Sequence, residues 1–124
     1  MAERSFVQAL GDAADGVATT FREQRNFRIQ LAIAVLVVAG AALLRFDSGR
    51  WVVLALTIGA VLGAELINTA LEHAVDCASP QASAGARAAK HAGAGAVLLL
   101  SVMAIVVGAV LFGTALVPLA HRGP

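Results

Sequence analysis

The stretch WVVLALTIGAVLGAELINTALEHAVD, from Trp51 to Asp76, begins like a membrane-spanning segment and then becomes acidic. Residues 51–64 carry no charge, which is typical of a helix in lipid. The remainder carries four polar side chains: Glu65, Asn68, Glu72 and Asp76. Because hydrocarbon is a poor solvent for carboxylates, either this segment lies outside the membrane or its acids have a function there.

The composition favours the membrane. Hydrophobic residues make up 59% of the 124 residues and charged residues 14%, whereas soluble domains have about 45–50% and about 25%. The length suits a single domain over residues 1–124. A net charge of +1 gives no reason to expect nucleic-acid binding. The lone Cys77 has no partner for an internal disulfide and lacks the spacing of a metal site.

Three long apolar runs predict three transmembrane helices. A helix needs roughly 20 residues to cross the hydrocarbon core, and helices are the only plausible spanning form for runs of this length. We expect spans near residues 27–45, 51–74 and 91–118. The predicted fold class is therefore an all-α membrane protein.

A further helix, expected at residues 3–22, has an amphipathic pattern. Its large apolar side chains fall on one helical face: Phe6, Leu10, Val17 and Phe21. This pattern favours a helix that lies on the membrane surface. The alternative is a helix that packs on a partner subunit.

The distribution of Lys and Arg predicts the orientation. Six of these residues lie before or at the start of the first span or in the second link: Arg4, Arg22, Arg25, Arg28, Arg87 and Lys90. Three lie on the other side: Arg45, Arg50 and Arg122. The positive-inside rule therefore places the N-terminus in the cytoplasm and the C-terminus outside. The small residues of Gly59–Gly63 let helices approach closely, although such residues are common in membrane helices. We also expect a homo-oligomer, because three helices alone cannot easily shield this many polar groups.

The acids of the second span share one helical face. At about 100° per residue, all four polar side chains fall within an arc of about 80°. One carboxylate can hold Mg²⁺, which prefers oxygen ligands and often binds together with substrate phosphates. Another can act as a general base on an alcohol. Arg87 and Lys90 could supply the cation that phosphoryl transfer requires.

Two other functions remain open for this acidic face. Acids within spans also mark ion or proton pathways. Alternatively, Glu65 or Glu72 forms a structural seam with a nearby cation. The cations available for such a seam are Arg25, Arg28 and Lys90.

The same residues carry a family resemblance. AELINTALEHAVD (Ala64–Asp76) closely resembles the signature E-x-x-N-x-A-[IL]-E-x-x-x-D of the prokaryotic diacylglycerol kinase and undecaprenol kinase family. QRNFRIQ (Gln24–Gln30) is similar to the family's E-R-N-F-x-x-H stretch. ARAAKHAGAGAVLL (Ala86–Leu99) resembles its A-K-x-A-K-D-x-x-A-G-A-V segment. The resemblance covers about residues 5–112.

The resemblance implies a surface helix and three transmembrane helices, assembled as a homotrimer in the bacterial inner membrane with active sites between subunits. It implies transfer of the γ-phosphate of ATP to a membrane lipid alcohol, with Mg²⁺. NTALEH and RNF look more like the undecaprenol kinase branch. Undecaprenol is therefore favoured over diacylglycerol as the lipid.

The resemblance also implies a role for each matched residue. Glu65 would be the base near the lipid hydroxyl, and Asn68 would help to position the reacting groups. Glu72 would be a metal ligand. Asp76 would serve the nucleotide site, and Lys90 would contact the phosphates of ATP.

Two positions depart from the family pattern. Gln24 stands where the family usually has a Glu that shares the metal with the acid matched by Glu72, so a neutral carbonyl would ligate instead. The neighbouring Glu23 would lie about 100° around a helix axis from Gln24. His91 stands where the family usually has an Asp. The alternative function is therefore a catalytically impaired relative that acts as a lipid-binding or assembly protein.

Overall fold

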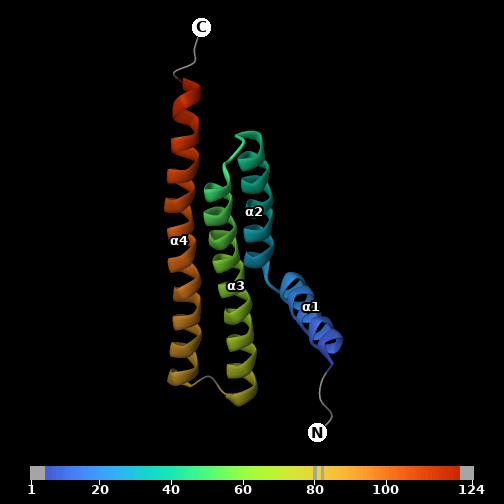
Figure 1. Cartoon of the computed structure of the whole chain (residues 1–124). Coiled ribbons are helices and arrows are strands. Elements are labelled where there is room, and N and C mark those ends of the chain that lie inside the picture. The colour runs from blue at the N-terminus through green and yellow to red at the C-terminus, as the bar shows by residue number, and fades with distance from the viewer. Residues whose placement is uncertain (1–4, 80, 82, 121–124) are drawn as a thin grey trace.

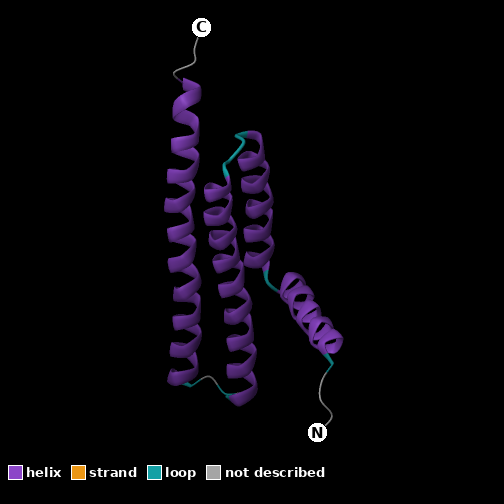
Figure 2. Ribbon diagram, in the orientation of Figure 1, coloured by secondary structure: helices purple, strands orange, loops and turns teal. Residues whose placement is uncertain are grey.

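The computed structural model describes residues 5–79, 81 and 83–120. These residues form four helices and, within the described ranges, no strand (Figures 1 and 2). The helices are α1 (Phe6–Glu23), α2 (Arg25–Leu43), α3 (Ser48–Ala78) and α4 (Ala84–Ala120). In Figure 1, α3 stands between α2 and α4, and α1 leaves the bundle at an angle from the start of α2. The predicted all-α fold is confirmed.

Helices α2, α3 and α4 are each long and apolar enough to cross a membrane. At about 1.5 Å per residue, the 31 residues of α3 extend about 46 Å and the 37 residues of α4 about 55 Å. Both lengths exceed the roughly 30 Å of a hydrocarbon core. Parts of α3 and α4 must therefore extend beyond the hydrocarbon.

Both of these helices extend further than the predicted spans. Helix α3 continues to Ala78, and α4 begins at Ala84 rather than at residue 91. The hydroxyl of Ser83 accepts a hydrogen bond from the backbone N–H of Ala86 at 3.0 Å. This contact caps α4 at its start, so Gly85 is part of the helix and not of the preceding link.

A capping box starts α1. The Ser5 hydroxyl accepts from the backbone N–H of Gln8, and the Gln8 side chain accepts from the backbone N–H of Ser5. The large apolar side chains of α1 are exposed in the single chain, Phe6 by 78%. They remain available to a membrane surface or to a partner. The helix ends at Glu23, because Gln24 has an extended backbone (φ −97°, ψ 110°).

An aromatic cluster joins the helices at the end of the bundle away from α1. The ring of Phe46, in the α2–α3 link, lies 4.9 Å from that of Phe112 and 6.3 Å from that of Trp51. The Arg50 guanidinium lies 5.7 Å from the centre of the Phe46 ring. Asp47 caps α3, and its hydrogen bond from the backbone N–H of Arg50 holds the pKa of that carboxyl below its usual value. This end of the bundle is therefore well packed.

Candidate functional site

The four polar residues of the acidic face lie at different depths along α3. Glu65 is buried, with 3% of its surface exposed. Asn68 and Glu72 are half-buried, and Asp76 is exposed. From Glu65 to Asp76 the helix rises about 16 Å. The acidic face therefore leads from the interior of the bundle to the end where α3 meets the α3–α4 link.

Glu65 receives a hydrogen bond from α2. The Nε2 of Gln30 donates to Glu65 Oε2 at 3.3 Å. Burying a carboxylate is costly unless it is hydrogen-bonded, so this contact helps to keep Glu65 inside the bundle. The other end of the same amide, Gln30 Oε1, is buried and has no hydrogen-bond partner among the described residues.

Asn68 and Glu72 form the next pair. The Nδ2 of Asn68 donates to Glu72 Oε1 at 3.0 Å, one helical turn further along α3. Asn68 Oδ1 is buried and, within the described part of the chain, has no hydrogen-bond partner. It faces Gly93 of α4, where a Cβ atom would collide with it. The glycine therefore allows α4 to pass directly over this amide.

Asp76 and Lys90 connect α3 to α4. Lys90 Nζ lies 2.5 Å from Asp76 Oδ1, and both side chains are partly exposed. Arg87, about one turn earlier on α4, is also exposed. The short α3–α4 link thus brings a cation to the outer end of the acidic face.

Helix α1 also reaches this region, but through Glu23. Glu23 Oε2 lies 3.1 Å from the Nε2 of His73, which is the neighbour of Glu72 on α3. Gln24 lies between the two helices, in extended backbone. The expectation that Glu23 and Gln24 differ by one helical step is therefore wrong, because α1 ends between them.

The oxygen atoms in this region fit one mode of Mg²⁺ binding. Among the described residues, no group of three or more His, Cys, Asp or Glu side chains is placed to hold a metal. Mg²⁺, however, is often held by one or two carboxylates together with substrate phosphates. The half-buried Glu72 carboxylate could act as a protein ligand in that mode, whereas Asn68 Oδ1 is covered by Gly93 of α4.

Two of the three cations proposed for a structural seam, Arg28 and Lys90, bind elsewhere. Arg28 donates to the backbone carbonyls of Phe21 and Arg22 at 3.0 Å and 2.8 Å. Lys90 pairs with Asp76. In the described structure Glu65 and Glu72 instead accept hydrogen bonds from neutral amides.

Gln30 is the residue of this site to which sequence reasoning gave no role. A signal for it exists, since it carries the only polar side chain in the run from Ile29 to Leu44. Gly93 lies within the stretch Ala86–Leu99, whose pattern gives no role to this glycine. Its close approach to Asn68 depends on the packing of two helices and has no local signature.

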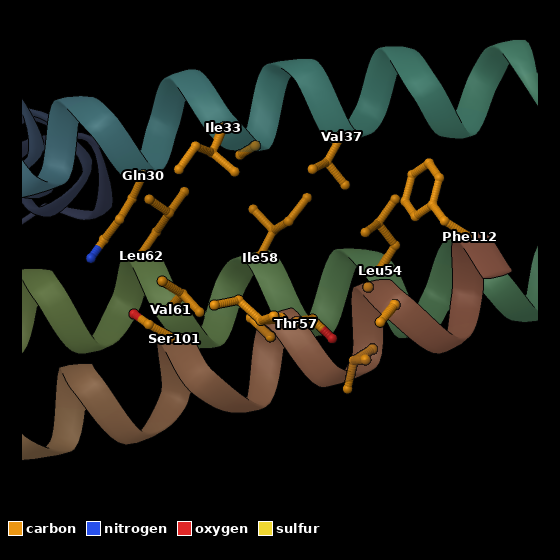
Figure 3. A pocket seen from close by; sticks show the side chains of 16 residues that line it. Gln30, Ile33, Val37, Leu54, Thr57, Ile58, Val61, Leu62, Ser101 and Phe112 are labelled. Atoms are coloured by element: carbon orange, nitrogen blue, oxygen red, sulfur yellow. The ribbon is translucent and has the colours of Figure 1, made fainter.

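Two grooves lie next to the acidic face. One, of about 590 Å³, runs between α2, α3 and α4 (Figure 3). The other, of about 560 Å³, lies where α1 meets α2 and α3, and Phe21, Phe27 and Leu66 help to line it. Both volumes lie within the range of small-molecule sites, about 300–1,000 Å³.

Comparison with known proteins gives consistent matches. The model of the family described as prokaryotic diacylglycerol kinase matches residues 11–112. The undecaprenol kinase of Bacillus subtilis (strain 168) is 35% identical over 107 residues, which cover 86% of this chain and 87% of that protein. A diacylglycerol kinase of Synechocystis sp. (strain ATCC 27184 / PCC 6803 / Kazusa) is 45% identical over 94 residues. These cover 75% of this chain and 54% of that protein, so the similarity spans about half of its length.

Proposed function

This chain belongs to the prokaryotic diacylglycerol kinase family and is a membrane lipid kinase, and on that premise we propose that it transfers the γ-phosphate of ATP to the hydroxyl group of undecaprenol. The similarity to an undecaprenol kinase extends over nearly the whole of both chains. The sequence identity to a diacylglycerol kinase is higher, at 45%, but the matched region covers only about half of that protein. Diacylglycerol is the nearest alternative substrate.

The observation that carries the proposal is the buried carboxylate of Glu65 within a transmembrane helix. Such a group is expensive in lipid and marks a functional site by default. A lipid hydroxyl reaches this depth more readily than a water-soluble substrate does. Glu65 then takes the proton of that hydroxyl as general base, and Asn68 positions the reacting groups.

The nucleotide occupies the outer half of the acidic face. Glu72 would hold Mg²⁺, and the bound ion would neutralise phosphate charge. Lys90 contacts the phosphates, and Asp76 holds Lys90 in place until ATP arrives. Arg87 supplies a second cation near the same end of α4. Phosphoryl transfer requires mainly this positioning and neutralisation of charge.

Gln24 contributes only a neutral carbonyl as a metal ligand. The acid that α1 brings to α3 is Glu23, which pairs with His73 beside Glu72. His91 is exposed on α4. An impaired relative is disfavoured, because the residues Glu65, Asn68 and Glu72 are all present and paired.

The enzyme is placed in the bacterial inner membrane with its N-terminus in the cytoplasm and its C-terminus outside. In Figure 1 the start of α2 points toward the same end of the bundle as the end of α3 and the start of α4, and α3 and α4 extend well beyond it. The basic residues at the starts of α2 and α4 therefore lie on the side from which cytoplasmic ATP would arrive, at different distances from the end of the bundle. A homotrimer would cover the apolar and half-buried polar surface that a single chain leaves open.

The test is transfer of labelled γ-phosphate from ATP with Mg²⁺ to undecaprenol and, separately, to diacylglycerol in mixed micelles. Wild type is compared with Glu65→Gln and with Gln24→Glu combined with His91→Asp. We expect transfer to undecaprenol, reduced at least about 100-fold in Glu65→Gln, as is typical for the loss of a general base. Transfer only to diacylglycerol would overturn the choice of lipid. Transfer only in the double variant would support the impaired relative.

A further inference from the structure

The groove between α2, α3 and α4 has an almost entirely apolar lining. Ile33, Val61 and Ile105 come from the three different helices. Figure 3 places Gln30 at one end and Phe112 at the other, with Ile58 between them. The hydroxyl of Thr57, which also lines the groove, already donates to the backbone carbonyl of Val53 at 2.7 Å. The groove therefore offers apolar contacts along most of its length.

Gln30 connects this groove to Glu65. Its side chain lines the groove and donates to the buried carboxylate at 3.3 Å. Its Oε1 is buried and, in the described structure, unpartnered. A hydroxyl group has one proton, which it can donate first to this amide oxygen and then, after rotating, to the carboxylate beside it. Gln30 therefore lies at the end of the apolar groove, carries an unpartnered acceptor in the described structure and is hydrogen-bonded to the Glu65 carboxylate.

We propose that this groove holds the part of the substrate's apolar chain that is next to the hydroxyl, and that Gln30 guides the hydroxyl to Glu65. The inference rests on the proposed function and adds to it a binding site and a positioning residue. Continuity with Glu65 favours the substrate over an ordinary bilayer lipid, which would have no use for the acceptor. A volume of about 590 Å³ accommodates only a segment of a long chain, and the remainder extends into the bilayer.

Two glycines of α4 provide a matched pair of variants. Gly108 lines the groove, and a Cβ atom there would meet nothing within 4 Å, so Gly108→Leu starts a larger side chain at an open position of the groove. Gly113 also has nothing within 4 Å, but it is exposed and outside the lining. Gly113→Leu therefore makes the same change away from the groove.

The first experiment measures binding without catalysis. An undecaprenol analogue with a diazirine next to its hydroxyl end is photolysed with the full-length protein, without ATP. A phosphatidylcholine with a diazirine in its acyl chain is the control. We expect the analogue to label Ile33, Val61 or Ile105, and Gly108→Leu to lose this labelling while Gly113→Leu retains it. Equal labelling by phosphatidylcholine, or labelling only at Phe21 and Phe27 beneath α1, would overturn the proposal.

The second experiment measures kinetics. Gly108→Leu and Gln30→Leu are each expected to raise the KM for undecaprenol roughly tenfold and to leave the KM for ATP and the oligomeric state unchanged. Gln30→His, which keeps a polar group, should recover part of the loss. A change of oligomeric state in Gly108→Leu would mean that a second copy of the chain fills the groove, and would overturn the proposal. Groove labelling without phosphorylation of any lipid would reject the proposed function alone.

Discussion

At the scale of single residues, the site depends on a glycine as well as on its polar side chains. Gly93 allows α4 to approach Asn68, because a Cβ atom would collide with Asn68 Oδ1 and lie 2.9 Å from Leu71 Cδ2. The amide of Asn68 also holds Glu72. A substitution at Gly93 would therefore affect Glu72 indirectly, by displacing the Asn68 amide that is hydrogen-bonded to it.

We predict that Gly93→Ala displaces the Asn68 amide and destabilises the bundle by about 1–3 kcal/mol, as is usual when atoms are added to a packed interface. Phosphotransfer should fall at least tenfold, an effect equivalent to about 1.4 kcal/mol or more. Thermal unfolding in detergent and the phosphotransfer assay measure the two effects.

The control is Gly95→Ala, two residues along α4, where a Cβ atom would meet nothing within 4 Å. It should resemble wild type in both measurements. If the two alanine variants behaved alike, close approach at Gly93 would not be what positions Asn68.

At the scale of elements, the break between α1 and α2 brings the surface helix to the site. The extended backbone of Gln24 separates the two helices, and Arg28 then reaches back to the carbonyls of Phe21 and Arg22. A cation at a helix C-terminus is favourable, because the last carbonyls carry partial negative charge. Arg28 therefore holds the end of α1 where Glu23 can contact His73.

We predict that Arg28→Gln loosens α1 while the three long helices remain intact. The loss at the helix terminus should be about 0.3–1 kcal/mol, since the arginine is exposed. Hydrogen exchange of the α1 amides should become faster, and exchange in α3 should not change.

Arg25→Gln is the control, because Arg25 is an exposed arginine in the same segment. It should leave exchange in α1 at the wild-type rate. Equal acceleration in both variants would indicate a general effect of charge at this end rather than the two hydrogen bonds of Arg28.

At the scale of the whole molecule, the two ends of the bundle differ in how they are held. Rings of Phe46, Trp51 and Phe112 pack together at one end. At the other end, the side chains of Asp76 on α3 and Lys90 on α4 form an exposed ion pair. Exposed ion pairs contribute only about 0.2–1 kcal/mol, so a phosphate can displace this one at little cost.

We predict that the Asp76–Lys90 pair acts in nucleotide binding more than in folding. Asp76→Asn and Lys90→Gln should each raise the KM for ATP several-fold and lower the thermal midpoint only slightly. The reversed pair, Asp76→Lys with Lys90→Asp, should restore the thermal midpoint and leave the KM for ATP high. Recovery of a normal KM by the reversed pair would show that the contact is only structural.

The sequence alone determined the number of helices, their type and the acidic face of α3. These properties depend on local pattern: long uncharged runs require helices in lipid, and residues spaced three or four apart share a helical face. The same local reasoning did not give the length by which α3 and α4 continue beyond the predicted spans; the cap at Ser83, for example, starts α4 at Ala84. Homotrimeric assembly and the roles of the site residues remain predictions.

Only the tertiary structure decided which residues contact the acidic face. Gln30 reaches Glu65 across 35 positions of sequence, and Lys90 reaches Asp76 across 14. The end of α1 at Glu23 decided that Glu23, rather than Gln24, contacts α3. Such contacts depend on how the helices cross and on where each one ends. A periodic pattern fixes the direction of a side chain from its own helix, but not the residue that it meets on another.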